Sequence, residues 1–172
     1  MYTPVDNQLG IQPIAYSSPV QNHPLGKTTR AYDPVYGEGE FIYLLGVAST
    51  VVGSLVIWGG ATGSPPSAVP TLQTTLAPTT TLQGKACAVA MSANVAAQYG
   101  WYQIEGNAVV AENGTFTGAG VKIYTQATGV VSTTAATGQE VVNATLVVAD
   151  GQPSAGLGVA YINRPFLQGA IT

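Results

Sequence analysis

The longest apolar run of the chain extends from Phe41 to Ile57 and contains no charged residue. Gly46 and Gly53 interrupt the run, and many of its other residues are β-branched, a type that is stiff at χ1 and favoured in sheets. A helix that crosses a membrane needs about 20 mostly apolar residues, more than this run provides. We therefore interpret it as two strands, over residues 40–49 and 51–58, and expect no membrane span.

Short apolar runs return at regular spacing after residue 84, separated by turn residues such as Asn113-Gly114 and Asp150-Gly151. Several short strands divided by such turns are typical of an all-β fold, a β-sandwich or a barrel-like domain. Residues 92–98 are the one segment that we expect to form a helical turn, with Ser92 as its cap. The expected strands are residues 85–91, 101–105, 108–111, 121–125, 141–148 and 157–162.

Residues 1–38 are expected to form an extended N-terminal arm, and residues 39–172 the β-rich core domain. Prolines recur through the arm, and each removes a backbone donor and favours extended geometry in the residue before it. Large apolar residues are dotted along it, which suits a segment that drapes over a partner, although a loose terminus remains the alternative. The candidate interface residues are Tyr2, Leu9, Ile11, Ile14, Tyr16, Val20, Leu25, Tyr32 and Tyr36.

A low-complexity stretch at about residues 59–84 is rich in Thr, Ser, Gly and Pro. Such composition predicts a long loop or a protruding hairpin within the core domain. Loops of this length in compact domains often carry an interaction.

Only 8% of the residues are charged, against roughly 25% in ordinary globular domains. The surface must therefore consist of small uncharged residues, or be covered by other protein. The net charge of −3 and five scattered basic residues argue against a nucleic-acid partner, which needs a basic patch.

Few residues of the chain are candidates for catalysis or metal binding. Cys87 is the single cysteine and His23 the single histidine, so we expect a buried thiol and no metal or histidine-based catalytic site. The lack of an intrachain disulfide fits assembly in a reducing cytoplasm. Glu38 and Glu40 would share one face of a strand, where a glycosidase-like pair is conceivable. We interpret them instead as solvated or paired with Arg30, and expect neither enzymatic activity nor a cofactor.

Four segments together resemble small structural proteins of tailed bacteriophages, similar in character to capsid decoration, or cement, proteins. The resemblance spans roughly residues 30 to 167. It does not include the first 29 residues, and the Thr/Pro-rich residues 62–83 look like a local insertion. The segments are AYDPVYGEGEFIYL at 31–44, which leads into GVAST at 46–50, then VAMSANV at 89–95, QYGWYQI at 98–104, and AYINRPF at 160–166 with Asp150-Gly151 before it.

The resemblance implies a structural virion protein on the capsid surface, with the phage major capsid protein as its partner. Such a protein stabilises the expanded capsid lattice, often as a trimer at three-fold positions, and is assembled in the host cytoplasm. One alternative is a phage tail component. Another is a carbohydrate-binding or adhesin module that uses Trp58 and the aromatic residues of Tyr99–Tyr102; rings exposed on one face would favour it.

Overall fold

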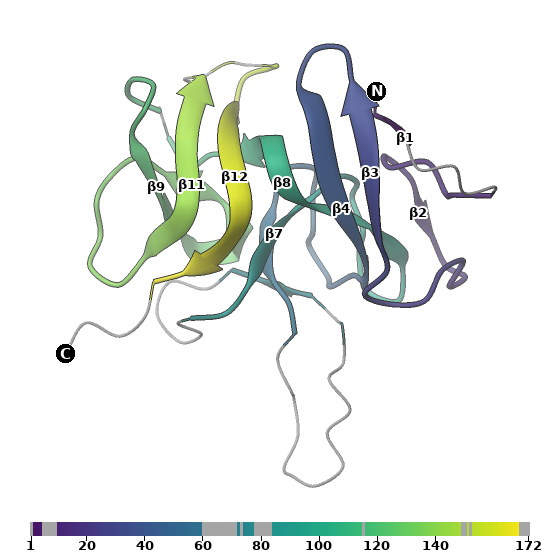
Figure 1. Cartoon of the computed structure of the whole chain (residues 1–172). Coiled ribbons are helices and arrows are strands. Elements are labelled where there is room, and N and C mark those ends of the chain that lie inside the picture. The colour runs from purple at the N-terminus through teal and green to yellow at the C-terminus, as the bar shows by residue number, and fades with distance from the viewer. Residues whose placement is uncertain are drawn as a thin grey trace, which may run out of the picture.

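The computed structural model describes residues 2–4, 10–59, 72, 74–77, 84–114, 116–148, 151 and 153–168. An antiparallel sheet curls through them into a half-barrel (Figure 1), which confirms the predicted all-β class. The one helical element among these residues is the 3₁₀ turn η1 (Ala127–Gly129). The strands are β1 (Thr3–Pro4), β2 (Ser17–Ser18), β3 (Thr28–Asp33), β4 (Gly37–Leu45), β5 (Leu55–Ile57), β6 (Thr75–Leu76), β7 (Cys87–Ala90), β8 (Tyr99–Ala111), β9 (Lys122–Thr125), β10 (Val131–Ser132), β11 (Glu140–Val148) and β12 (Leu157–Leu167).

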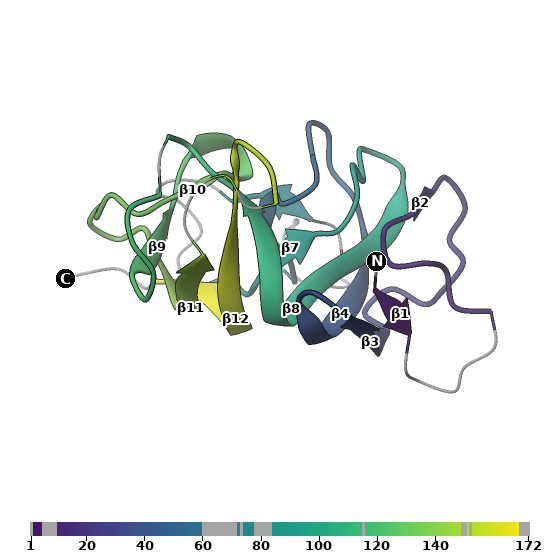
Figure 2. The ribbon, with the colours of Figure 1, turned by 90° about the horizontal axis from the view of Figure 1, so that it is seen from above.

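Strand β8 connects the two halves of the sheet. Residues 99–105 pair with β4, and residues 105–111 pair with β12, so the sheet follows the order β1-β3-β4-β8-β12-β11-β9-β10. Seen from above, β8 runs between the β3–β4 side and the β11–β12 side (Figure 2). The sequence predicted two separate strands here, over residues 101–105 and 108–111. They form one strand because the intervening Gly106, whose φ is +101°, pairs with Ile162, and the pairing with β12 continues on both sides of it.

The apolar run of residues 41–57 forms β4, a loop and β5. The loop starts earlier than predicted, at Gly46, because this residue lies against the backbone of residues 94–95. A Cβ on Gly46 would come within 2.7 Å of the carbonyl oxygen of Val95 and closer still to that of Asn94. Among the described residues, no helix has the length and hydropathy that a bilayer span needs.

The predicted helical turn at residues 92–98 is wrong. The segment is an irregular loop held by tertiary contacts. The side-chain amide of Asn94 is buried and donates to the hydroxyl of Tyr102 (2.8 Å), and the amide of Gly46 donates to the carbonyl of Gln98 (2.8 Å). These contacts outweigh the weak helix propensity of a short segment.

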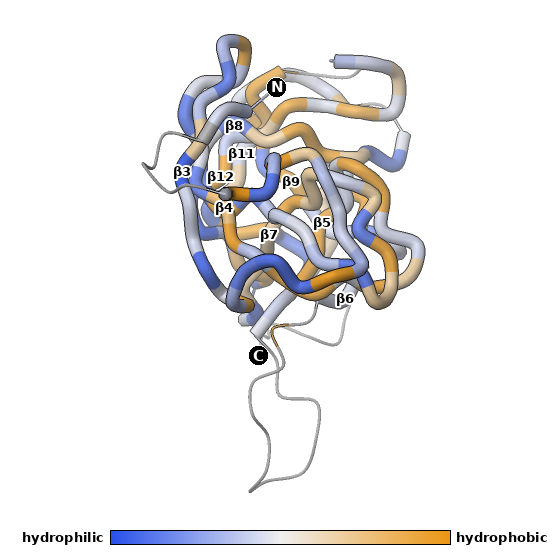
Figure 3. The backbone as a smooth tube through the Cα atoms, turned by 90° about the vertical axis from the view of Figure 1, so that its right-hand side faces the viewer, coloured by the Kyte–Doolittle hydropathy of each residue, from blue (hydrophilic) through white to orange (hydrophobic). Residues whose placement is uncertain are grey.

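The second half of β4, residues 41–44, is buried on both faces, which explains its unbroken apolar sequence FIYL. Ile42 and Leu44 belong to one core cluster, whereas Phe41 and Tyr43 belong to another. A third and larger cluster fills the space between β5 and β7 and the β8–β12–β11–β9 side. Hydrophobic stretches accordingly run through the middle of the molecule, with hydrophilic ones, including β3, at its periphery (Figure 3).

The cluster around Phe41 and Tyr43 is covered by the N-terminal residues, and we call it the arm cluster. Its buried members are Ile14, Ala31, Phe41, Tyr43 and Trp101, with Tyr2, Ile11, Leu25, Met91 and Tyr99 packed against them. Residues 28–33, which the sequence predicts as part of an extended arm, instead form β3, and its residues alternate between exposed and buried. The N-terminal residues thus cover part of the protein's own sheet.

Gln12 is the hydrogen-bond partner of several polar atoms that the N-terminal residues bury. Its backbone carbonyl accepts the indole N–H of Trp101 (2.9 Å), and its side-chain oxygen accepts the hydroxyl of Tyr43 (3.2 Å) and the amide of Asn22 (2.8 Å). Its backbone N–H donates to Nε2 of His23 (3.1 Å). The polar atoms of the buried rings are thereby satisfied, as burial requires.

We expect acidification to loosen this cover through His23. Burial, with repulsion from Lys27, lowers the pKa of His23 below its usual value of 6.5. A lowered folded pKa means that stability is complete above about pH 6.5 and falls as the pH drops toward the folded pKa, by at most about 1.4 kcal/mol per pH unit. Urea unfolding between pH 5 and 8 measures this slope. His23→Gln should remove most of it, and an unchanged slope in that variant would contradict the assignment.

We expect Gly46→Ala to destabilise the fold by about 2 kcal/mol or more, because the new methyl group would overlap backbone atoms of residues 94–95 that cannot move without disturbing the loop. Ala48→Ser, at the exposed neighbouring position, is the control and should change stability by less than about 0.5 kcal/mol. Thermal unfolding of both variants tests the difference.

Candidate functional site

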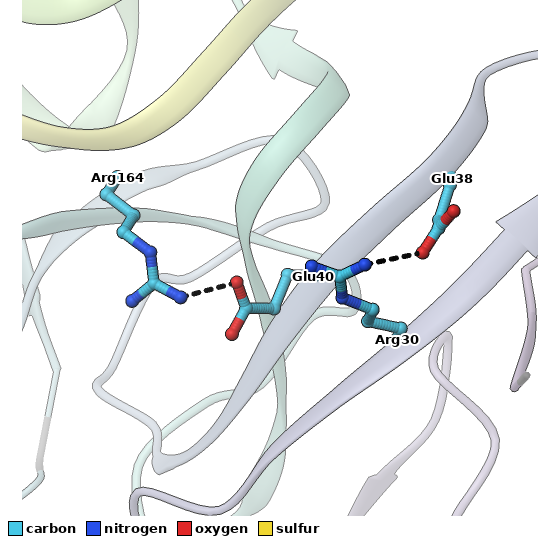
Figure 4. A network of polar contacts seen from close by, with 4 residues as sticks. All are labelled: Arg30, Glu38, Glu40 and Arg164. Carbon is cyan, nitrogen blue, oxygen red and sulfur yellow. Dashed lines mark hydrogen bonds and ion pairs between the residues drawn. The ribbon is translucent and has the colours of Figure 1, made fainter. Parts of the chain in front are cut away.

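Charged residues are scarce in this chain, yet several gather beside the β3–β4 hairpin. We call this site the ionic pocket. It has a volume of about 140 Å³ and is lined by Arg30, Glu38, Gly39, Glu40 and Glu105. Two ion pairs lie side by side here (Figure 4): Arg30 Nη1 contacts Glu38 at 3.2 Å, and Nη2 of Arg164, which does not line the pocket, contacts Glu40 at 2.6 Å.

The sheet register brings these residues together. Arg30 of β3 is opposite Glu40 of β4, and Glu40 is opposite Glu105 of β8. A register shift between Glu40 and Phe41 marks a bulge, which commonly re-aims side chains. The pairing of Glu38 with Arg30 confirms the sequence-based interpretation of that carboxylate. Glu40 pairs instead with Arg164, which is 124 positions away.

Arg164 reaches the pocket from an irregular part of β12. Its φ is +46°, in the left-handed region, and Asn143 on the neighbouring β11 has a φ of +61°. The β11–β12 pairing jumps here, from Val142 opposite Phe166 to Ala144 opposite Ile162. A non-glycine residue in this conformation costs of order 1 kcal/mol or more, so the surrounding structure holds Arg164 in place.

The charged side chains at the pocket differ in how far they are exposed to solvent. The side chain of Glu40 is only 12% exposed, whereas those of Arg30, Glu38 and Arg164 are more than half exposed. Glu105 is half-buried and makes no ion pair with the residues that the structure describes. The sequence alone does not point to Glu105 and Arg164, because neither stands in a recognisable motif.

A second concave feature, the apolar groove, lies between the tip of the β3–β4 hairpin and the β11–β12 ends. Its volume is about 250 Å³, and Val35 at its rim is 78% exposed. Val147 and Val148 are also exposed. The lining residues are Val35, Tyr36, Asn107, Val147, Val148 and Val159.

The predicted interface residues do not form one surface. Ile14 is buried in the arm cluster, and Tyr2, Ile11 and Leu25 pack against it, so these four contact the protein itself. Leu9 lies outside the described residues.

The remaining four candidates are available at the surface or line the groove. Tyr16, Val20 and Tyr32 are 60%, 65% and 50% exposed. Tyr36 lines the apolar groove, and its carbonyl accepts the side-chain amide of Asn107 (3.1 Å).

The aromatic residues of β8 offer no exposed sugar platform. Trp101 and Tyr102 are fully buried. The Trp101 ring packs edge-on against the Tyr43 ring, with 5.0 Å between the ring centroids. Trp58 is partly buried, and its indole N–H donates to the carbonyl of Cys87 (3.3 Å). Because rings exposed on one face would favour carbohydrate binding, these inward-facing rings weaken that alternative.

Cys87 is buried as predicted, and its burial raises the pKa of the thiol to about 12. The thiolate required for nucleophilic chemistry is therefore scarce at neutral pH. No group of three or more metal-ligating side chains occurs in the described part of the chain.

No protein-family profile, curated protein or solved structure matches this chain.

We expect the Glu40–Arg164 pair to contribute more to stability than the Glu38–Arg30 pair, because Glu40 is shielded from solvent and Glu38 is not. Double-mutant cycles with Gln and Ala substitutions should give a coupling of roughly 1 kcal/mol for the first pair and about 0.5 kcal/mol or less for the second. Both couplings should fall as salt is added. Equal couplings would mean that the difference in burial has no energetic consequence.

Proposed function

We propose that this chain is a structural virion protein that binds the outer surface of a phage capsid and stabilises the expanded lattice of the major capsid protein. The observation that carries the proposal is the apolar groove with its exposed valine rim, on a surface that has few charges. Exposed apolar patches on folded domains commonly mark protein contacts. The resemblance of residues 30–167 to decoration proteins supplies the class of partner.

The composition of the surface suits dense assembly. Charged side chains are depleted in the centres of protein interfaces, because an unpaired charge is costly to bury. Only 8% of this chain is charged, and three ion pairs among the described residues engage Arg30, Lys122 and Arg164. A large part of the surface is therefore available for burial against neighbours at little electrostatic cost.

The mechanism is stabilisation by selective binding. A protein that binds the expanded lattice and not its precursor stabilises the expanded form by the free energy of binding. Many copies that each bridge neighbouring capsid subunits add through multivalency. We propose a trimer at three-fold positions as the bound form, in keeping with the same resemblance.

In this proposal, only part of the arm is available for contacts with other proteins. Its residues Ile11, Ile14 and Leu25 cover the protein's own sheet and are not free to dock. The exposed Tyr16 and Val20 remain candidates for contacts with a capsid subunit or a neighbouring copy.

Sedimentation with emptied, expanded shells of the major capsid protein from the same genome tests the proposal. The wild-type protein should pellet with the shells at a fixed stoichiometry, and sizing of the protein alone should show whether trimers form before docking. A protein that stays in the supernatant, or that assembles into tubes by itself, contradicts the proposal, and tubes would favour a tail component.

Val35→Asp should weaken binding to shells about tenfold or more, because a carboxylate at the rim of the apolar groove would be buried unpaired at the interface. The fold should not change, since Val35 is 78% exposed. Val52→Asp is the matched control, because Val52 is also exposed (47%) but lies outside the groove. If both variants bind as the wild type does, the groove is not the contact surface.

A further inference from the structure

Residues 11–25 form a strap over the arm cluster, and a glycine in the left-handed conformation stands at each end of it. The φ angles of Gly10 and Gly26 are both +80°. No atom of the described residues would lie within 4 Å of a Cβ on Gly10, so the chain has room to turn there. Hinges of moving segments are commonly small residues at the ends of an element. Figure 2 shows the strap as a loop at one end of the molecule, with β2 beside β8.

The strap is held to the sheet mainly through side chains. Its strand β2 has two residues, which pair with residues 99–100 of β8. The backbone N–H of Asn22 donates to the hydroxyl of Tyr43 (3.3 Å), and Gln12 accepts from Tyr43 and Trp101. Three residues of the strap are prolines, which have no amide to donate. A segment attached in this way opens at a lower free energy than the sheet beneath it.

His23 closes the strap at its base. Its Nε2 accepts the backbone N–H of Gln12 (3.1 Å). Its ring packs against the rings of Tyr43 and Trp101, with centroid distances of 5.1 and 5.4 Å. A backbone N–H can only donate, so Nε2 must present its lone pair and the ring must be neutral. Protonation of Nε2 would set one N–H against another and break this hydrogen bond.

The groups around His23 do not favour a positive charge on its ring. None of the ion pairs among the described residues involves His23. Burial of the ring, followed by repulsion from the Lys27 ammonium, lowers its pKa below 6.5. The ionisable groups of the sheet at this place are the hydroxyls of Tyr43 on β4 and Tyr99 on β8, whose rings stack at 6.4 Å. Burial raises the pKa of Tyr43, so its hydroxyl stays uncharged and offers no counter-ion.

We propose that the strap is a pH-sensitive conformational switch: protonation of His23 breaks its contact with Gln12 and raises the population of a form in which residues 11–25 have moved away from the sheet, while the sheet stays folded. Gln12 couples the two events, because the residue whose N–H His23 accepts is also the acceptor for Tyr43 and Trp101. The change is confined to one segment, in contrast to a uniform loss of stability in acid. The opened form uncovers the buried aromatic face of β4 and β8, and the switch operates whether or not the chain binds a capsid.

The direction of the switch follows from the lowered pKa of His23. Because this pKa is below 6.5 in the closed form, the closed strap is most stable above about pH 6.5 and loses stability as the pH falls toward the folded pKa. The equilibrium constant for opening then rises by at most about tenfold per pH unit. Hydrogen exchange detects such changes even when the opened form is a minor population.

Hydrogen exchange of the full chain between pH 5 and 8, followed by NMR, tests the switch. The probe is the indole Nε1–H of Trp101, which the carbonyl of Gln12 accepts; Trp58→Phe identifies its signal, because the chain has two tryptophans. After correction for the intrinsic pH dependence of exchange, we expect protection of this N–H to fall by up to about tenfold per pH unit below about pH 6.5. The amides of β12 should keep their protection.

His23→Gln keeps an acceptor for the N–H of Gln12 but does not titrate, so the pH dependence of indole protection should disappear. The slope with pH decides the outcome, even if this variant weakens the strap at every pH. Lys27→Gln removes the repulsion, raises the pKa of His23 toward its ordinary value and should lessen the fall in protection. Lys85→Gln is the matched control, because Lys85 has no part in the pKa shift of His23, and it should behave as the wild type does.

Three results would overturn the switch. Indole protection that does not change with pH in the wild type would mean that the strap does not respond to protonation. A pH dependence that persists in His23→Gln would assign the response to another group. Loss of β12 protection together with that of the indole would mean that acid unfolds the whole sheet and that the strap does not open separately.

Discussion

The buried aromatic rings of Tyr43 and Trp101 impose the constraint on which this fold depends. Each ring must be shielded from water while its polar atom keeps a hydrogen-bond partner. Gln12 meets both requirements, since its carbonyl and its side-chain oxygen accept from the two rings, and the residues around it close over the cluster. Without this cover, β4 and the first half of β8 would expose one apolar face.

The pairing of β4 with β8 also places the charged residues of the ionic pocket. Because Phe41 and Tyr43 are paired with Gln103 and Trp101, the bulge between Glu40 and Phe41 determines where Glu40 and Glu105 meet. Glu40 can then pair with Arg164, which joins β12 to the opposite side of the half-barrel across 124 positions of sequence. The charge arrangement thus depends on the register of β3, β4 and β8 and on one distant arginine of β12.

The two concave sites differ in the kind of contact they suit. The apolar groove offers area that is easily desolvated, which favours affinity. The charged side chains at the ionic pocket instead form ion pairs within the chain, and Glu40 is shielded from solvent. Several of the chain's few charges thus gather beside one hairpin, whereas uncharged residues line the groove.

The sequence by itself determined the all-β class, through β-branched runs and regularly spaced turns, and the burial of Cys87 in a run of small apolar residues. It also indicated that Glu38 is solvated or paired with Arg30, because Arg30 is the basic residue nearest to it along the chain. Only the tertiary structure decided that residues 28–33 form a strand, that residues 92–98 do not form a helical turn, and that Gln12 covers Trp101. It alone brought Glu105 and Arg164 to Glu40. The reason is that packing partners and bulges join residues far apart in the chain, and no local pattern of polarity records which distant residue will fill a given space.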